Sequence, residues 1–361
     1  EKYKLPTIQA KPILSEMIDA FEKNQKNRVL SSEQTIYLNE LGKYYLINSI
    51  SSDDYELIKS FDEVESIVPN YIYSIDSISS TDFRVPNDAG YQRQWGLTAV
   101  KAETAWKFAT GKGVIVGVVD TGIDYEHPDL KNSLWINTKE DINNSGYFEP
   151  WPYNVEIDGV RGDLNGIDDD GNGFIDDVIG YDFVDQLTAN VGDYSKPDSN
   201  PMDENGHGSL VSGIIAAETN NKIGIAGLAF NAKIIAIRAF DAGGNAESDD
   251  IARAIVYGAI NGAKVMNFSF GEKFYSPIIH DAVRFAYSLG CTMVSSSGNN
   301  NSDEQHYPSD HEEVITVGSA NQQGERAFRS NYGSMLRLIA PGQEILSTNL
   351  GGGYRTADGT S

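Results

Sequence analysis

Val114-Ile-Val-Gly-Val-Val119, followed at once by Asp120, is the clearest indication of fold class in this 361-residue chain. An uninterrupted apolar run of this kind is typical of a strand whose two faces are both covered. Similar runs recur downstream, with helical segments between several of them. The expected strands are 233–238, 264–268, 292–295 and 314–317, and the expected helices are 208–218, 248–261 and 277–289. This alternation predicts an α/β fold with a parallel sheet flanked by helices.

Three motifs carry candidate catalytic groups. Asp120 closes the first expected strand, and active sites of parallel sheets form at the carboxyl ends of the strands. His207 lies between glycines in Asn205-Gly-His-Gly-Ser209, where a capping or turn histidine is the plain alternative. Ser361 follows Asp358-Gly-Thr. A serine hydroxyl becomes a good nucleophile when a base takes its proton and an acid fixes that base's tautomer. The order Asp, His, Ser is far more specific than any one of the three motifs.

In this order the motifs resemble those of the subtilisin-like serine proteases, the subtilases. The resemblance spans residues 95–361 and implies a subtilisin-like sheet and hydrolysis of proteins or peptides through an acyl-enzyme. It is supported by further matching motifs: Asp120-Thr-Gly-Ile-Asp124, His127-Pro-Asp-Leu130, Asn267-Phe-Ser-Phe-Gly271, Ser297-Gly-Asn299, Tyr307-Pro308, Ala340-Pro-Gly342 and Gly359-Thr-Ser361.

The resemblance also implies a role for each matching residue. Asp120 would orient His207, which would act as general base and then as general acid. Ser361 would attack the scissile carbonyl, and Asn299 would donate its side-chain amide to the oxyanion.

Two extended segments, Asn267–Gly271 and Ser295–Gly298, would bind the substrate, and the first would do so by strand addition. The second would form one wall of the pocket for the side chain that precedes the scissile bond. His306 stands where the base of this pocket is often glycine in the family. Ser295, Ser296 and Ser297 stand where the family often has alanine. We therefore expect a more polar pocket, with a solvent-facing His306 as the alternative. The other expected substrate-binding residues are Ser269, Phe270, Gly271, Ser296, Ser297 and Gly298.

Calcium is the expected cofactor, and the resemblance implies one strong site. There a carboxylate, an Asn side chain and several backbone carbonyls would surround the ion, and either Gln92 or Gln94 would complete the shell. The expected ligands are Asp129, Thr219, Asn221, Ile223 and Ile225.

A second calcium loop is expected in the acidic stretch 168–177. Side-chain oxygens stand there at alternate positions, and a glycine is sixth, as in the first part of an EF-hand loop. Ile179 occupies the twelfth position in place of an acid, so we expect a compact loop rather than a true EF-hand. An acidic turn holding only water is the alternative. The expected ligands are Asp168, Asp170, Asn172, Asp176 and Asp177.

The chain is expected to contain three parts. Residues 1–75 resemble a propeptide, a small α+β ferredoxin-like domain that would act as an intramolecular inhibitor, although a permanent binding module is an alternative. Residues 76–93 read as a linker containing the maturation site, with the cleaved bond in about 74–86. Residues 94–361 form the catalytic domain, with an acidic insertion at 131–200. The family resemblance makes this domain C-terminally incomplete.

Composition excludes several classes of protein. A formal charge of −24 argues against nucleic-acid binding. The single cysteine, Cys291, precludes an internal disulfide and reads as a small core residue. No apolar run reaches the ~18 residues of a membrane span. The first residue, Glu1, suggests that a signal peptide has been removed, and with the family resemblance this predicts a secreted or cell-surface enzyme made as a zymogen. A silent binding protein and a calcium-dependent scaffold remain alternatives, the latter disfavoured by the intact Asp, His, Ser and Asn set.

Overall fold

The computed structural model describes residues 6–10, 37–38, 44–46, 56, 59–60, 64–69, 85–185, 192–193 and 196–361. The chain divides into two compact units, Glu1–Ser79 and Ser80–Ser361. In the first unit an antiparallel sheet has the order β2 (Tyr37–Leu38), β3 (Tyr44–Leu46), β1 (Pro6–Ala10) and β4 (Val64–Pro69). The sequence pattern also predicts two helices in this unit, near 12–24 and 53–61; the first lies outside the described residues and the second largely so, and the domain roles remain predictions.

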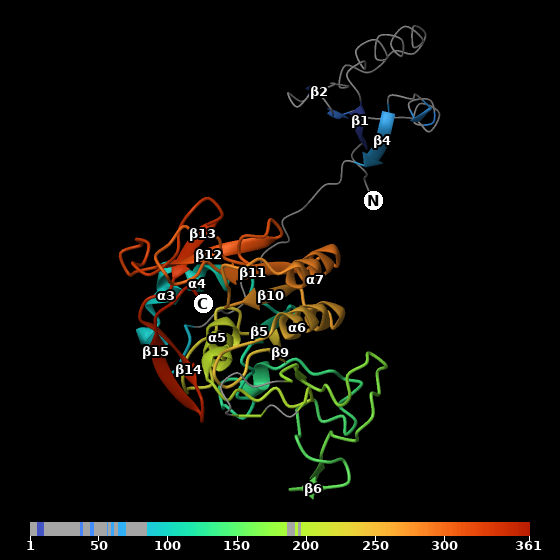
Figure 1. Ribbon diagram of the computed structural model, residues 1–361, viewed down its shortest axis with the longest axis vertical. Helices are drawn as coiled ribbons and strands as arrows, with labels where there is room; N and C mark the ends of the chain where they lie inside the picture. Colours follow the sequence, from blue (N-terminus) through green and yellow to red (C-terminus); the bar gives the residue numbers. More distant parts are fainter. Residues whose placement is uncertain are drawn as a thin grey trace. The chain divides into compact units, whose positions relative to one another are not determined.

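The second unit is built on a seven-stranded parallel sheet (Figure 1). This confirms the predicted subtilisin-like α/β architecture, and the two edge strands, β8 and β13, are additions that the hydrophobic pattern did not indicate. In sheet order the strands are β13 (Leu338–Pro341), β12 (Val314–Ala320), β11 (Thr292–Ser296), β10 (Val265–Phe268), β5 (Ile115–Asp120), β9 (Lys233–Arg238) and β8 (Gly180–Asp182).

Three long helices cover the sheet. They are α5 (His207–Ala216), α6 (Ser248–Ile260) and α7 (Pro277–Ser288), and α6 and α7 lie side by side (Figure 1). Pro277 begins α7 at a position where a missing N–H costs nothing. Asp249 and Asp250 occupy the first turn of α6, where they complement the helix dipole.

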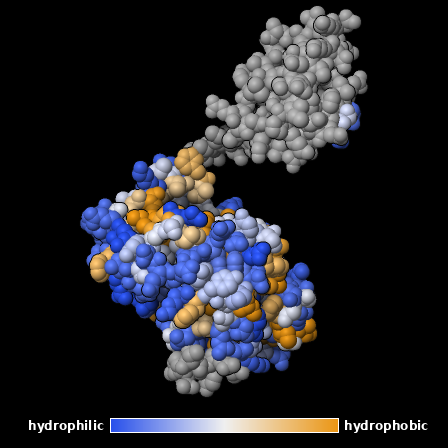
Figure 2. All heavy atoms as spheres, turned by 45° about the horizontal axis from the view of Figure 1, so that its top comes forward, coloured by the Kyte–Doolittle hydropathy of each residue, from blue (hydrophilic) through white to orange (hydrophobic). Residues whose placement is uncertain are grey.

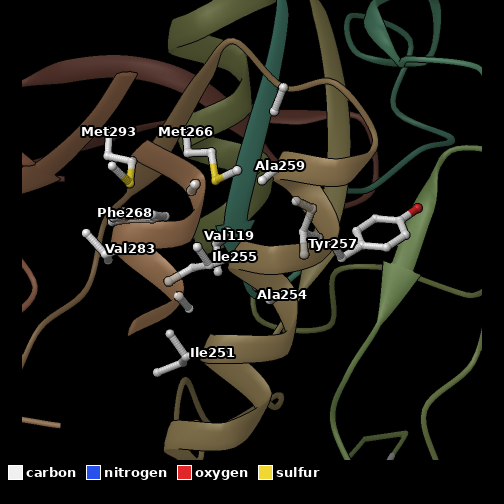
Figure 3. Packing of buried hydrophobic residues seen from close by; sticks show 14 of the residues in the cluster. Val119, Ile251, Ala254, Ile255, Tyr257, Ala259, Met266, Phe268, Val283 and Met293 are labelled. Atoms are coloured by element: carbon white, nitrogen blue, oxygen red, sulfur yellow. The ribbon is translucent and has the colours of Figure 1, made fainter. Parts of the chain in front are cut away.

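Alternation along β5 supplies both hydrophobic cores. Val116 and Val118 pack on the α5 side with residues such as Val211, whereas Val119 packs on the opposite side with α6 and α7. Figure 3 shows this second core, in which Ile255 and Val283 of the helices face Met266, Phe268 and Met293 of the strands. The two covered faces explain the continuous apolar runs in the sequence.

A β-hairpin brings the end of the chain back across α5. Its strands are β14 (Ile345–Asn349) and β15 (Gly353–Ala357). The hydroxyls of Ser347 and Thr348 donate to the carbonyls of Leu210 and Ser209, each at 2.6 Å. The remaining elements are η1 (Tyr91–Arg93), α3 (Trp95–Ala99), α4 (Ala102–Ala105), η2 (Lys131–Ser133), β6 (Glu156–Ile157) and β7 (Val160–Arg161).

Two further expectations concern the burial of Cys291 and the absence of a membrane-spanning segment. Cys291 is buried just before β11, as predicted. Hydrophilic residues predominate on the face shown in Figure 2, with hydrophobic residues in scattered groups. Among the described helices, none combines the length and the apolar character that crossing a membrane requires.

Candidate active site

Asp120 lies buried at the carboxyl end of β5, with 3% of its surface exposed. Its side-chain Oδ1 accepts a hydrogen bond of 2.8 Å from the N–H of Thr121. Its backbone carbonyl accepts from the N–H groups of Ala239 and Phe240, which follow the neighbouring strand β9. The carboxylate is therefore held firmly at the edge of the sheet.

His207 begins α5 and faces that carboxylate. Nδ1 of the imidazole lies 2.7 Å from Oδ1 of Asp120 and 3.0 Å from Oδ2. Gly206 makes this approach possible with a φ of +96°, a left-handed conformation that favours glycine. Gly208 has no side chain, and a Cβ there would overlap the carbonyl oxygen of Gly122. Two of the glycines around His207 are thus needed so that α5 can begin against the end of β5.

The pKa of His207 reflects two opposed effects. Burial is the largest single effect and lowers it, but the charge and hydrogen bond of Asp120 together with the charge of Asp203 raise it, so that the net pKa lies above the ordinary value of 6.5. An acid that fixes the imidazole in this way keeps Nδ1 protonated and leaves Nε2 free to act as a base.

Asp203 is a buried positioning residue that sequence reasoning missed. Its carboxylate accepts hydrogen bonds from Thr121 Oγ1 and from the Ser209 hydroxyl, at 2.8 and 2.6 Å. It also accepts from three backbone N–H groups around the start of α5, those of Asn205, Gly206 and Ser209. An acid shortly before a helix start is the signal that could have indicated it.

Ser361 and Asn299 lie at the rim of the neighbouring strands. Oδ1 of Asn299 accepts the N–H of Thr360 at 2.9 Å, and the Thr360 hydroxyl accepts the N–H of Gly298 at 3.2 Å. The Ser269 hydroxyl donates to the Ser361 carbonyl at 3.0 Å, and the Ser361 hydroxyl donates to the Ser269 carbonyl at 3.4 Å. Among the hydrogen bonds of the described residues, none joins Ser361 to His207.

Part of the expected substrate surface lines a cleft of about 770 Å³ that contains Asp120 and His207. Ser269, Phe270 and Gly271 are on its wall. The segment expected to form the second wall is buried. Ser296 is the last residue of β11, and Ser297 and Gly298 follow it; only 7% of Ser296 and 5% of Ser297 are exposed. His306 is half-buried rather than turned to solvent.

The first expected calcium site has Asp129 at its centre. Asp129 is fully buried and accepts from the Asn221 amide at 2.6 Å, from the Ile225 N–H at 2.9 Å and from the Tyr354 hydroxyl at 3.0 Å. A second acid, Asp88, comes from the segment before η1 and was missed by sequence reasoning; it accepts the N–H of Asn220 in this loop at 2.9 Å.

Two carboxylates, those of Asp88 and Asp129, contact this loop. Burial and, to a smaller extent, repulsion by Asp129 raise the pKa of Asp88. None of the salt bridges of the described residues neutralises either acid. Of the two glutamines considered, Gln94 binds the backbone of Ala226 through both ends of its amide. Thr219 and Ile223 lie on the same loop, the former bonding the Ala217 carbonyl.

The acidic loop gathers only part of its expected ligands. Oxygens of Asp168 and Asp170 come within 4.8 Å of one another and of a carboxylate oxygen of Glu140. Asp176 instead accepts the N–H groups of Asn165 and Gly166. Asp177 and Asn172 lie further along the loop, where Asp177 accepts from the Asn172 amide at 3.0 Å and from the Tyr257 hydroxyl at 2.8 Å.

Glu140 is the acid in this cluster that the sequence did not indicate, because it precedes the loop. Only 1% of it is exposed. Oε1 accepts the N–H groups of Asp169 and Asp170, while Oε2 has no hydrogen-bond partner among the described residues. Burial is the main cause that raises the pKa of Glu140 to about 7. A buried, unpartnered oxygen next to two carboxylates is the donor set that a hard cation such as Ca²⁺ prefers.

Comparison with known proteins finds a matching family and several similar proteases. A sequence model described as the Subtilase family matches residues 111–361. A thermophilic serine proteinase of Bacillus sp. (strain AK1) is 35% identical over 300 residues, which are 82% of this chain and 60% of that protein. Thermitase of Thermoactinomyces vulgaris is 32% identical, over 76% of this chain and 80% of thermitase. A solved protease structure from Pseudoalteromonas arctica is similar with a TM-score of 0.61 and 28% identity, over 77% of this chain and 83% of that one.

Proposed function

Because this chain belongs to the subtilase family, whose similar members are serine proteases, we propose that it is a serine endopeptidase acting on protein substrates. The observation that carries the proposal is the 2.7 Å contact between His207 and Asp120 at a cleft of about 770 Å³. Ser361 and Asn299 belong to the same edge of the sheet, where a substrate carbonyl would be bound.

In the proposed reaction the Ser361 hydroxyl gives up its hydrogen bond to the Ser269 carbonyl and donates to Nε2 of His207 instead. Oγ then bonds to the scissile carbonyl carbon while Nε2 takes the hydroxyl proton, and Asp120 stabilises the imidazolium that forms. The side-chain amide of Asn299 donates to the oxyanion. When the tetrahedral intermediate collapses, the C–N bond breaks and the imidazolium protonates the leaving amine. Water, activated by the same base, then hydrolyses the acyl ester and restores the serine.

Asn299 suits the oxyanion role because of how its amide is held. Its Oδ1 accepts the N–H of Thr360, which aligns the amide plane, and its Nδ2 has no hydrogen bond to another described residue. A donor whose direction is fixed before the reaction needs no reorganisation when charge develops on the substrate oxygen.

We propose in addition that the protein binds calcium. Asp129 and Asp88 would hold one ion within the loop at 219–225, and Glu140, Asp168 and Asp170 would hold another. Calcium would neutralise buried negative charge and so stabilise the fold, with no part in the chemical step.

The proposal also includes secretion and synthesis as a self-inhibited zymogen, in which residues 1–75 form the inhibitory propeptide. Cleavage within the linker 76–93 would release the active enzyme. Comparison of the amino termini of the wild type and of the Ser361→Ala variant tests this. We expect processing of the wild type alone, and equal processing of both would refute self-cleavage.

The decisive experiment is labelling of the full-length protein with a fluorophosphonate, together with hydrolysis of an unfolded protein. We expect labelling and hydrolysis by the processed wild type and neither by Ser361→Ala. Absence of both from a folded, processed wild type would overturn the proposed function.

A further inference from the structure

The gap that should receive a substrate side chain lies between two diverging segments. Strands β10 and β11 are parallel neighbours, with Phe268 opposite Ser295. Beyond this pair the chains continue to Gly271 and Gly298. Ser361 contacts Ser269 on the first segment, as described above, so the nucleophile proposed here stands at one end of the gap.

The imidazole of His306 occupies the other end of this gap. A Cβ built on Gly271 would lie 2.5 Å from Nε2 of His306, and the ring carbon Cε1 would be closer still. A Cβ built on Gly298 would lie 2.9 Å from both Nε2 and Cδ2 of the ring, and 2.5 Å from Nδ2 of Asn331. Real side-chain atoms do not approach so closely. The ring therefore packs against the backbone of both glycines, with the Asn331 amide also against Gly298, and occupies space between the two glycines.

Several bonds hold the ring in place. Nδ1 lies 2.9 Å from Oγ of Ser309, and the backbone N–H of His306 donates to the Asp310 carboxylate at 3.1 Å. The next residue, Tyr307, forms a two-bond antiparallel bridge with Glu272, which keeps the His306 backbone beside Gly271. Ser309 itself is fully buried, so the partner of the ring is also fixed.

These contacts also determine which atom of the ring meets a substrate. The Ser309 hydroxyl donates its one proton to the His306 carbonyl at 2.7 Å. Nδ1 must therefore donate to Ser309 Oγ, and the neutral ring leaves Nε2 as an acceptor. Nε2 is the ring atom that lies near both glycines.

We propose that His306 closes the pocket for the residue before the scissile bond, so that the enzyme cleaves after glycine, alanine or serine. This inference rests on the proposed endopeptidase function and adds its substrate class. A phenylalanine or leucine side chain would need the volume that the imidazole holds, whereas a methyl or hydroxymethyl group does not. A serine hydroxyl could also donate to Nε2.

The test compares two substrates, the p-nitroanilides of succinyl-Ala-Ala-Pro-Ala and succinyl-Ala-Ala-Pro-Phe. For the wild type we expect kcat/KM to be at least about 100-fold higher for Ala, since even one methylene in a pocket changes it by about 10–200-fold. His306→Gly should reverse this preference by opening the gap. Gln305→Gly is the matched control, because it loosens the same exposed loop without removing the ring, and it should keep the wild-type preference.

A second readout needs no variant. The wild type should cut an unfolded protein mainly after Gly, Ala and Ser, as identified by mass spectrometry of the products. Frequent cleavage after Phe or Leu would overturn the inference, as would an unchanged preference in a folded His306→Gly protein. Both outcomes leave fluorophosphonate labelling intact, and this separates them from a failure of the proposed function itself.

Discussion

The Thr121 hydroxyl donates a hydrogen bond of 2.8 Å to the carboxylate of Asp203 and accepts one of 2.9 Å from the N–H of Gly208. Thr121 follows Asp120, and Gly208 follows His207. This buried hydroxyl therefore joins the end of β5 to the start of α5 and maintains the distance between the acid and the imidazole.

Thr121→Val should reduce activity more than it reduces stability. The valine keeps the shape but removes both hydrogen bonds and leaves the Asp203 carboxylate with one donor fewer, at a cost of about 1–3 kcal/mol. We expect kcat to fall while KM changes little, measured on any cleaved peptide substrate. Thr138→Val, at an exposed threonine, is the control. A wild-type kcat in a folded Thr121→Val protein would show that this bridge does not position His207.

The fall of kcat/KM at acidic pH should reflect protonation of His207. Its pKa lies above 6.5 because the effects of Asp120 and Asp203 together exceed that of burial, so kcat/KM should begin to fall at a pH higher than for an isolated imidazole. Asp120→Asn removes the charge, so the imidazole should titrate at lower pH, while kcat drops by about 10⁴-fold. NMR titration of the ring in both proteins measures the shift. An unchanged pKa in the variant would contradict the role of Asp120.

The same pair should make stability depend on pH. Since the pKa is raised in the folded state, the pair stabilises the fold fully at pH values below the pKa of unfolded histidine. This contribution is lost as the pH rises through the folded-state pKa. Urea unfolding of Ser361→Ala, which avoids self-digestion, should show the loss, and Ser361→Ala/Asp120→Asn should show less of it. A loss of equal size in both proteins would assign it to other groups.

Calcium removal should lower the melting temperature, because an ion bound only to the folded state adds about 2.7 kcal/mol at 100 times its Kd. Glu140→Gln and Asp129→Asn should each remove one calcium measured by isothermal titration calorimetry. Glu312→Gln, an exposed acid outside both sites, should remove none. If Glu140→Gln binds as many ions as the wild type, the second site is wrong while the first can still stand.

The buried Arg238 should make Asp182 important for stability. The guanidinium lies 2.9 Å from Asp182 and 2.8 Å from Glu204, and only 1% of its side chain is exposed. Asp182→Ala would leave a buried charge short of a partner, which costs about 3–5 kcal/mol. Asp249→Ala breaks an exposed pair with Arg253 and should cost about 0–1 kcal/mol. Equal losses in urea unfolding would show that burial does not decide the effect.

Features that depend on residues adjacent in the sequence could be predicted from it. The apolar run before Asp120 specified a doubly covered strand, because both faces of β5 must be apolar. It failed for β8, which is short and contains Gly180 and Asp182, and which depends on pairing with β9. It also failed for Glu140, whose unpartnered oxygen meets the acidic loop only after the chain folds.

Periodicity and motif order are local properties, so the family, the parallel sheet and the Asp, His and Ser candidates could be inferred from the amino-acid sequence. Only the folded chain shows that Asp203 organises the start of α5 and that Glu140 meets the acidic loop. It also decided that the ring of His306 lies between Gly271 and Gly298. Each of these depends on how closely distant segments approach, and that distance is set by packing.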